Sequence, residues 1–198
     1  MTAAPALISL HLYHYYECHL GPFRNLSDLP PEEAEAVLNG IRQADQTFAA
    51  KRAADYLTVR RELEERVRRL FVAKGGHPQR ARPHYLTVGA CPWLLAWYVA
   101  GCAVTIPLAG VAADTISFTY GDTFPALRLQ DGRPYRGQVY TVAELPVLLA
   151  EYGLPQEWNP AGQSGPDRYI EAQLWDDRPL LDFTRRTRFY HTIADRSG

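Results

Sequence analysis

The stretch "LISLHLYHYY", residues 7–16, predicts the first strand of the fold. Its side chains alternate between two faces with period 2, as they do in a strand. One face carries Ile8, Leu10, Leu12, His14 and Tyr16, and the other carries Ser9, His11, Tyr13 and Tyr15. His14 therefore follows an apolar row towards the core, where a histidine bonded to a backbone group is the ordinary arrangement. His11 is expected to face solvent.

Two helices are predicted after this strand. "LPPEEAEAVLNGIR" predicts a helix starting near Pro31, because proline and glutamate are favoured in a first helical turn. A longer helix is expected over about residues 45–74, where apolar residues recur at three- and four-residue spacing. Gly75 and Gly76 supply its stop.

The rest of the chain predicts mainly strands, in "RPHYLTV", "CAVTIPL", "TISFTYGD" and "RYIEAQLW". A short apolar helix is expected from Pro92. A third helix is expected in "YTVAELPVLLAEYGLP", where Thr141 and Glu144 have capping-box spacing and Gly153 stands at the C-cap. A strand, then helices, then mainly strands is the order of an α+β fold. We expect one globular domain over residues 1–198, with a helical insert at about 31–75.

Composition limits the function. The chain has 198 residues and a formal net charge of -1, so it carries no global excess of positive charge for a polyanion. Cys18, Cys91 and Cys102 are odd in number and have no paired spacing, which argues against a disulfide framework and favours the cytoplasm. The N-terminus lacks the basic residues that open a secretory signal. The uncharged run at 90–113 is broken by Pro and Gly, which favours a buried helix and strand over a membrane span.

Positive charge is concentrated in one segment. Residues 51–82 hold ten Lys and Arg against four acidic residues, a net +6. One face of the predicted helix there carries Arg60, Arg61, Arg66, Arg68 and Arg69. This face favours a non-catalytic module that binds nucleic acid or an acidic protein. The alternative is a solvated helix face, paired locally by Glu62, Glu64 and Glu65.

Common motifs of enzymes and metal sites are absent from the sequence. There is no GxGxxG, P-loop, GxSxG or HExxH. His11, His14, Cys18 and His19 fall within nine residues, but their spacing matches no standard zinc pattern. A strand would also point His11 and His14 to opposite faces. We therefore predict no metal site.

Three segments, taken in order, are similar to a known superfamily. "LYHYY" contains His14, "RPHYLTVG" contains Tyr85, and "RYIEAQLWDDRPL" contains Glu171. This order resembles the His-Tyr-Glu branch of the ADP-ribosyltransferase superfamily. "AVTIPL" followed by "ISFTYGD" is similar to paired strands of DarT-type DNA ADP-ribosyltransferases.

The resemblance implies a split antiparallel sheet with two or three peripheral helices, and an enzyme that uses NAD⁺ as a substrate. Such an enzyme breaks the glycosidic bond of NAD⁺ and transfers ADP-ribose to a nucleic-acid or protein acceptor. His14 would hold a ribose hydroxyl, Tyr85 would stack on nicotinamide, and Glu171 would bond the reacting ribose and orient or deprotonate the acceptor. Glu171 stands in Glu-x-Gln, not the Glu-x-Glu of arginine-modifying relatives, which leaves the acceptor open. The structural alternatives are a core aromatic at Tyr85 and an outward-facing Glu171 on an edge strand.

Further site residues are expected from position. Arg60 or Arg61 would meet a pyrophosphate or an acceptor phosphate, because guanidinium binds phosphate in a bidentate way. Phe118 and Tyr120 would stack on nicotinamide or a base. The Gly- and Pro-rich loop at 154–167 would cover the site as a flap that reads the substrate. Together these residues are expected to converge on one cleft.

Overall fold

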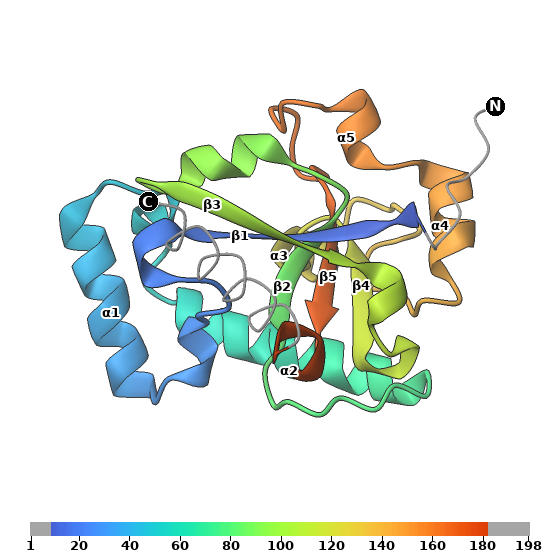
Figure 1. The fold of residues 1–198 in the computed structure, drawn as a ribbon, viewed down its shortest axis with the longest axis horizontal. Coiled ribbons are helices and arrows are strands. Elements are labelled where there is room, and N and C mark those ends of the chain that lie inside the picture. The colour runs from blue at the N-terminus through green and yellow to red at the C-terminus, as the bar shows by residue number, and fades with distance from the viewer. Residues whose placement is uncertain (1–8, 182–198) are drawn as a thin grey trace, which may run out of the picture.

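The computed structural model describes residues 9–181. Its centre is a five-stranded sheet in the order β3-β1-β2-β5-β4, with every neighbouring pair antiparallel (Figure 1). The strands are β1 His11–Glu17, β2 His84–Val88, β3 Gly101–Pro107, β4 Ile116–Tyr120 and β5 Ile170–Leu174. The α-helices are α1 Pro31–Ala44, α2 Tyr56–Ala73, α3 Thr123–Arg128, α4 Leu145–Tyr152 and α5 Pro155–Trp158. The predicted α+β class is confirmed.

The sheet opens between β1 and β2. β1 pairs with β3 along its whole length, but it pairs with β2 only at Leu12↔Val88 and Tyr13↔Thr87. Beyond these pairs the strands diverge, and β1 and β3 run across the other three strands in Figure 1. The sheet therefore has the split antiparallel form that the resemblance implied.

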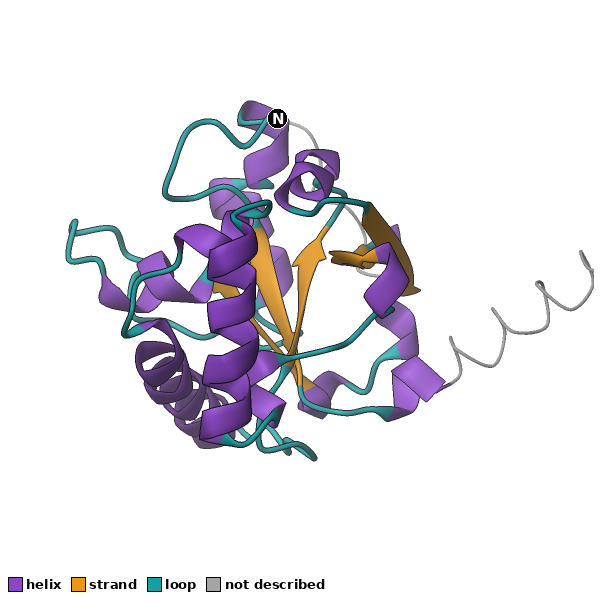
Figure 2. Ribbon diagram, turned by 90° about the vertical axis from the view of Figure 1, so that its left-hand side faces the viewer, coloured by secondary structure: helices purple, strands orange, loops and turns teal. Residues whose placement is uncertain are grey.

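The two faces of β2, β5 and β4 differ in polarity. One face joins a core that includes Leu86, Phe118, Ile170, Ala172 and Leu174, packed against β1, β3 and α4. The other face carries Tyr85, Thr87, Ser117, Thr119, Glu171 and Gln173, as the strand registers require. A second apolar cluster from α2, α3 and Trp175 lies over this polar face, and Figure 2 shows the helices packed beside the strands.

The helix predictions are confirmed in position, with corrections at their starts. α1 begins at Pro31, with Glu32 and Glu33 in its first turn. Asp45, the C-cap of α1, takes a left-handed conformation (φ 45°). The next helix therefore does not begin at residue 45 as predicted. A short 3₁₀ turn, Phe48–Lys51, intervenes, and α2 starts at Tyr56.

The third helix also starts later than predicted. Glu144 Oε2 accepts hydrogen bonds from the backbone N–H and the hydroxyl of Thr141, which is the expected capping-box contact. α4 nevertheless begins at Leu145, because Pro146 is tolerated only in a first turn. Gly153 ends it with a positive φ of 68°. The loop at 154–167 contains the short helix α5.

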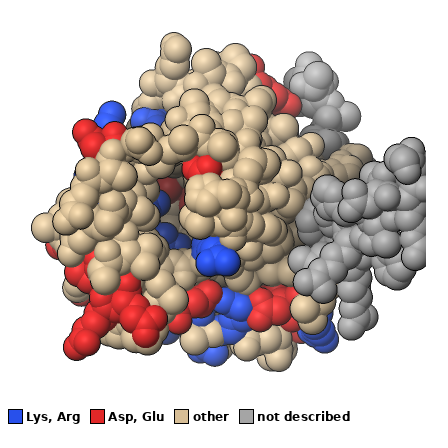
Figure 3. Space-filling view, turned by 60° about the vertical axis from the view of Figure 1, so that its left-hand side comes forward, with Lys and Arg blue, Asp and Glu red and all other residues tan. Residues whose placement is uncertain are grey.

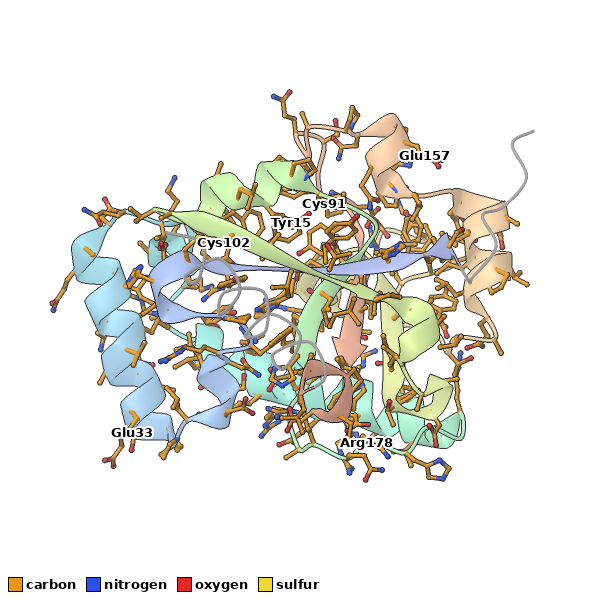
Figure 4. The ribbon with its side chains drawn as sticks, viewed as in Figure 1. Tyr15, Glu33, Cys91, Cys102, Glu157 and Arg178 are labelled. Atoms are coloured by element: carbon orange, nitrogen blue, oxygen red, sulfur yellow. A yellow bond between two sulfur atoms is a disulfide. The ribbon has the colours of Figure 1, made fainter. Side chains whose placement is uncertain are left out.

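A disulfide joins Cys18, just after β1, to Cys102 on β3, with the two Cα atoms 5.1 Å apart (Figure 4). The cysteine count and spacing, which argued against a disulfide framework, were therefore misleading for this pair. Sequence spacing could not show this pair, because the two cysteines are 84 residues apart and meet only through the pairing of β1 with β3. Disulfides persist mainly in oxidising compartments, so the cysteine count no longer supports the cytoplasm.

The uncharged run at 90–113 forms the 3₁₀ helix Pro92–Trp97 and strand β3, as expected from its Pro and Gly residues. Within residues 9–181, no helix is both long enough and apolar enough to cross a bilayer.

Candidate functional site

Glu171 lies on β5 with its side chain on the polar face, 6% exposed. Its Oε1 accepts hydrogen bonds from the hydroxyl and backbone N–H of Thr123 and from Gln173 Nε2. Burial, helped by the nearby carboxyl of Asp122, raises the pKa of Glu171 from 4.5 to about 8, although Thr123, Gln173 and Arg60 oppose the shift. A carboxyl with this pKa exchanges its proton near neutral pH, as a general acid or base must.

Asp122 is fixed beside Glu171 by the start of α3. Its Oδ1 caps the helix by accepting from Phe124 N at 2.8 Å. Its Oδ2 accepts from the hydroxyl of the buried Tyr169 at 3.0 Å. The two carboxyl groups therefore lie close enough together for Asp122 to raise the pKa of Glu171. The sequence interpretation did not single out Asp122.

Tyr85 lies on β2 on the same face as Glu171. Its hydroxyl donates to Glu64 Oε1 at 2.8 Å, and the Arg60 guanidinium lies 4.6 Å from the centre of its ring. Burial, together with the charges of Glu64 and Glu171, raises the pKa of Tyr85 well above its usual range, despite the opposing charge of Arg60. Tyr85 is therefore a neutral phenol, and one face of its ring is already covered by a cation.

Glu64 is the residue that organises this part of the site. Its side chain is 0% exposed. One oxygen, Oε1, accepts from the hydroxyls of Ser27 and Tyr85 and from Arg60 Nε, at 2.7–3.0 Å. Its Oε2 has no hydrogen-bond partner and lies 3.6 Å from Arg82 Nε. Glu64 thus ties helix α2 to strand β2 and to the segment before α1.

The expected outer face of α2 needs correction at Arg60 and Glu64. Residues 57, 60, 64, 67 and 71 have the three- and four-residue spacing of one helical face, and Leu57, Glu64, Val67 and Phe71 on it are buried. The Arg60 side chain lies on the same face and is 13% exposed. In the sequence, Arg60 and Glu64 stand four residues apart in line with the apolar residues of this face. That position was the signal that could have predicted their burial.

Arg60 is held in place through all three of its nitrogens. Nε donates to Glu64, Nη1 to the hydroxyl of Tyr56 at 2.7 Å, and Nη2 to Asn25 Oδ1 at 2.7 Å. Burial opposes the charge, but Tyr56, Tyr85 and Glu64 outweigh it, and the pKa of Arg60 is raised. Arg60 is also close enough to Glu171 to lower the pKa of that carboxyl. It therefore remains charged beside the candidate catalytic group.

The molecular surface is hollowed on the side of the molecule that Figure 3 shows. Basic and acidic side-chain atoms lie inside the hollow, between apolar or uncharged walls. Arg52, Arg60 and Asp122 are each half-buried. Charged groups held in a hollow can stabilise charge that develops during a reaction.

His14 is placed differently from the role that the resemblance implies. Its Nδ1 is 2.8 Å from the Tyr85 carbonyl oxygen, and its Nε2 accepts from Phe23 N at 2.9 Å. The Phe23 ring stacks on the imidazole, with centroids 4.5 Å apart. Burial lowers the pKa of His14 to about 4, so the ring is neutral, with Nδ1 the donor. Since both nitrogens have backbone partners, the half-buried His14 links β1 to β2 and offers no free nitrogen to a ribose hydroxyl.

Three other expected binding residues are not brought to this site. Phe118 is 0% exposed in the core on the opposite face of the sheet. Tyr120 lies on that face too, and its hydroxyl donates to the Tyr152 carbonyl at 2.9 Å. Arg61 donates to the Leu29 carbonyl at 3.1 Å. The alternation along β4 decides the first two, because Thr119, the residue between them, pairs with Glu171.

The loop at 154–167 packs against the molecule near the end of β2. Gln156 Nε2 donates to the Val88 carbonyl at 2.6 Å, and Gly162 lies against the ring of Trp93. Its role as a substrate-reading flap stays a prediction.

Most of the positively charged side chains at 51–82 make hydrogen bonds or ion pairs with other parts of the chain. Arg66 donates to the Leu127 carbonyl, Lys74 pairs with Glu144, and Arg80 pairs with Asp28 and Asp177. Arg68 and Arg69 are exposed and have no hydrogen bond or ion pair with any residue in 9–181. A broad basic face for nucleic acid is therefore less well supported than the sequence suggested.

Neither a metal centre nor a cysteine nucleophile is found in the described residues. Within 9–181 there is no group of three or more His, Cys, Asp or Glu side chains that could hold a metal ion. Cys91 is a free thiol but it is buried, and burial raises its pKa to about 12. Its backbone N–H donates to the hydroxyl of Tyr15 at 2.6 Å, and the two residues lie together in Figure 4. A thiol of this kind is inert as a nucleophile.

No protein-family model matches the chain, and searches of the curated proteins and of the solved structures found no significant match.

Proposed function

We propose that this protein is an ADP-ribosyltransferase-like enzyme that uses NAD⁺ as its substrate, with Glu171 as the catalytic carboxylate. The observation that carries the proposal is the buried carboxyl of Glu171 with its raised pKa, placed beside Arg60, Tyr85 and Asp122. The split antiparallel sheet is the scaffold that the sequence resemblance implies.

The chemistry suits these residues. Breaking the glycosidic bond of NAD⁺ develops positive charge on the ribose, which a carboxylate aimed at the sugar stabilises in the transition state. The same carboxylate can take a proton from the acceptor, a step that contributes about 10² to 10⁴ in rate. The acceptor is a nucleic acid or a protein.

His14 and Tyr85 have different parts in this proposal. His14 is a positioning residue, because its bonds to the Tyr85 carbonyl and Phe23 N–H hold the strand that carries Tyr85. Tyr85 presents a neutral ring next to Glu171, held by Glu64. The face of that ring away from Arg60 is the one that nicotinamide would contact.

The test is NAD⁺-dependent labelling, together with release of nicotinamide, by the wild type and by Glu171→Gln. The variant keeps the shape and removes the charge, so transfer should fall about 10²- to 10³-fold while NAD⁺ binding is retained. Glu62→Gln is the matched control, since Glu62 is exposed on α2. Wild-type transfer by Glu171→Gln, or no turnover of NAD⁺ by the wild type, would contradict the proposal.

The pH dependence is a second test. If ionised Glu171 acts as the base, kcat/KM should rise with pH and level off above about 8, the pKa of this carboxyl in the free protein. A profile that is flat between pH 6 and 9 would argue against Glu171 as the titrating group.

A further inference from the structure

Arg52 is a half-buried arginine that the proposed chemistry has not yet used. It follows the 3₁₀ turn Phe48–Lys51 and precedes α2. Its guanidinium lies 4.3 Å from the centre of the Tyr56 ring. The guanidinium makes no hydrogen bond and no ion pair with any residue in 9–181, while the backbone N–H of Arg52 donates to the Ala49 carbonyl at 3.3 Å. All five N–H donors of the guanidinium are therefore available to a ligand.

Four residues from three segments interact electrostatically with this guanidinium. Tyr56 and Arg60 come from α2, Tyr98 follows the 3₁₀ helix Pro92–Trp97, and Asp122 caps α3. Burial lowers the pKa of Arg52, and the nearby charge of Arg60 adds to this effect, while Tyr56, Tyr98 and Asp122 oppose it. Asp122 makes no ion pair with Arg52, and its two oxygens accept from Phe124 N and the Tyr169 hydroxyl.

Arg60 supplies a second charge beside Arg52. Three of its N–H donors are taken by Glu64, Tyr56 and Asn25, which leaves two for another acceptor. These same bonds fix its orientation, so little rotamer freedom is lost when a ligand binds. Two neighbouring arginines, one rigid and one without a partner, are suited to a group with several anionic oxygens.

We propose that Arg52 and Arg60 form a binding site for a phosphate-bearing ligand, next to Glu171. Arg52 binds the anionic oxygens with its free donors, and Arg60 contributes charge from the fixed position set by Glu64. If the ligand is NAD⁺, the group bound is its diphosphate, and this part rests on the proposed function. Arg52 therefore makes the main contact with the anion. It lies before α2, outside the helix face on which Arg60 and Arg61 were expected to bind phosphate.

Calorimetric titration of the full chain with inorganic pyrophosphate, ADP-ribose and adenosine tests the site without any turnover. Pyrophosphate and ADP-ribose should bind, and Arg52→Gln should weaken both about 10-fold or more, while adenosine should be unaffected by the change. Arg69→Gln is the matched control, because it removes the same charge from an exposed position on α2. Arg52→Lys keeps the charge without the planar fork, and should recover part of the affinity.

The outcomes separate this site from the proposed function. Equal weakening by Arg52→Gln and Arg69→Gln, or no binding of pyrophosphate, would overturn the site. Pyrophosphate binding that depends on Arg52, in a protein that does not turn over NAD⁺, would support the site and contradict the transferase. A phosphate ligand other than NAD⁺ is indicated if pyrophosphate binds but ADP-ribose does not.

Discussion

Phe118 and Glu171 lie on neighbouring strands, β4 and β5, but on opposite faces of the same sheet. The Phe118 face is closed by apolar side chains from β1, β3 and α4. The Glu171 face buries a chain of hydroxyl, amide and carboxyl groups. Burial of the apolar face stabilises the fold. Burial of the polar groups on the other face costs free energy, which their hydrogen bonds must offset. Replacing Phe118 should therefore lower stability, whereas replacing the carboxyl of Glu171 should raise stability and lower activity.

The largest effect is expected for Phe118→Ala. Removing this fully buried ring should lower the free energy of unfolding by about 3 to 5 kcal/mol, because the burial of the ring is lost and a cavity is left in the core. Urea denaturation measures the change. Phe118→Leu, which keeps most of the volume, should cost less. A loss under about 1 kcal/mol for the alanine variant would show that this face is not the main core.

Glu171→Gln should act in the opposite direction on stability. The folded-state pKa of Glu171, about 8, lies above its ordinary value of 4.5, so the folded protein holds a proton that the unfolded chain releases between these values. Stability therefore falls as pH rises from about 4.5 to about 8, and the glutamine variant escapes this loss. We expect the variant to be more stable than the wild type by about 2 to 4 kcal/mol at pH 9, and by little at pH 5.

Urea denaturation of both proteins at pH 5, 7 and 9 tests this prediction. A variant that gains stability at high pH and loses transfer activity would mark Glu171 as a carboxyl kept at a cost to folding. A glutamine variant that is less stable than the wild type at pH 9 would show that the charge on Glu171 is stabilised in the folded protein.

Gln173→Leu should break the polar chain behind Glu171. Gln173 accepts from the Ser117 hydroxyl and donates to Thr119, Thr123 and Glu171. Leucine leaves these buried groups without that partner, which should cost about 1 to 3 kcal/mol. The change in the free energy of unfolding is the measurement. A neutral or stabilising result would mean that the amide does not hold the chain together.

The smallest effect is expected for Tyr120→Phe on the apolar face. The substitution keeps the ring in the core and removes the hydroxyl, which donates to the carbonyls of Tyr152 and Gly153 at 2.9 and 3.4 Å. A loss of about 1 kcal/mol is expected, with NAD⁺ turnover unchanged. Thermal denaturation and the labelling assay check the two parts. A large loss of turnover without a loss of stability would return Tyr120 to the site.

Much of the fold could be predicted from local patterns. Strand alternation in "RYIEAQLW" and "TISFTYGD" located β5 and β4, and the Pro and Gly signals located α1 and the end of α4. Tyr85 and Glu171 could be singled out, and they share one face of the sheet. The start of α2 could not be predicted, because the left-handed turn at Asp45 has no distinct sequence signal.

The sequence by itself determined which strands and helices form and which side chains share a face, because these depend on residues two to four positions apart. Only the tertiary structure decided that Cys18 meets Cys102, that His14 has no free nitrogen, and that Glu64 is buried. The partners of Glu64 include Ser27, 37 residues away, and Tyr85, 21 residues away. A charged side chain can be buried only where such partners satisfy it, and their arrival depends on how distant segments pack.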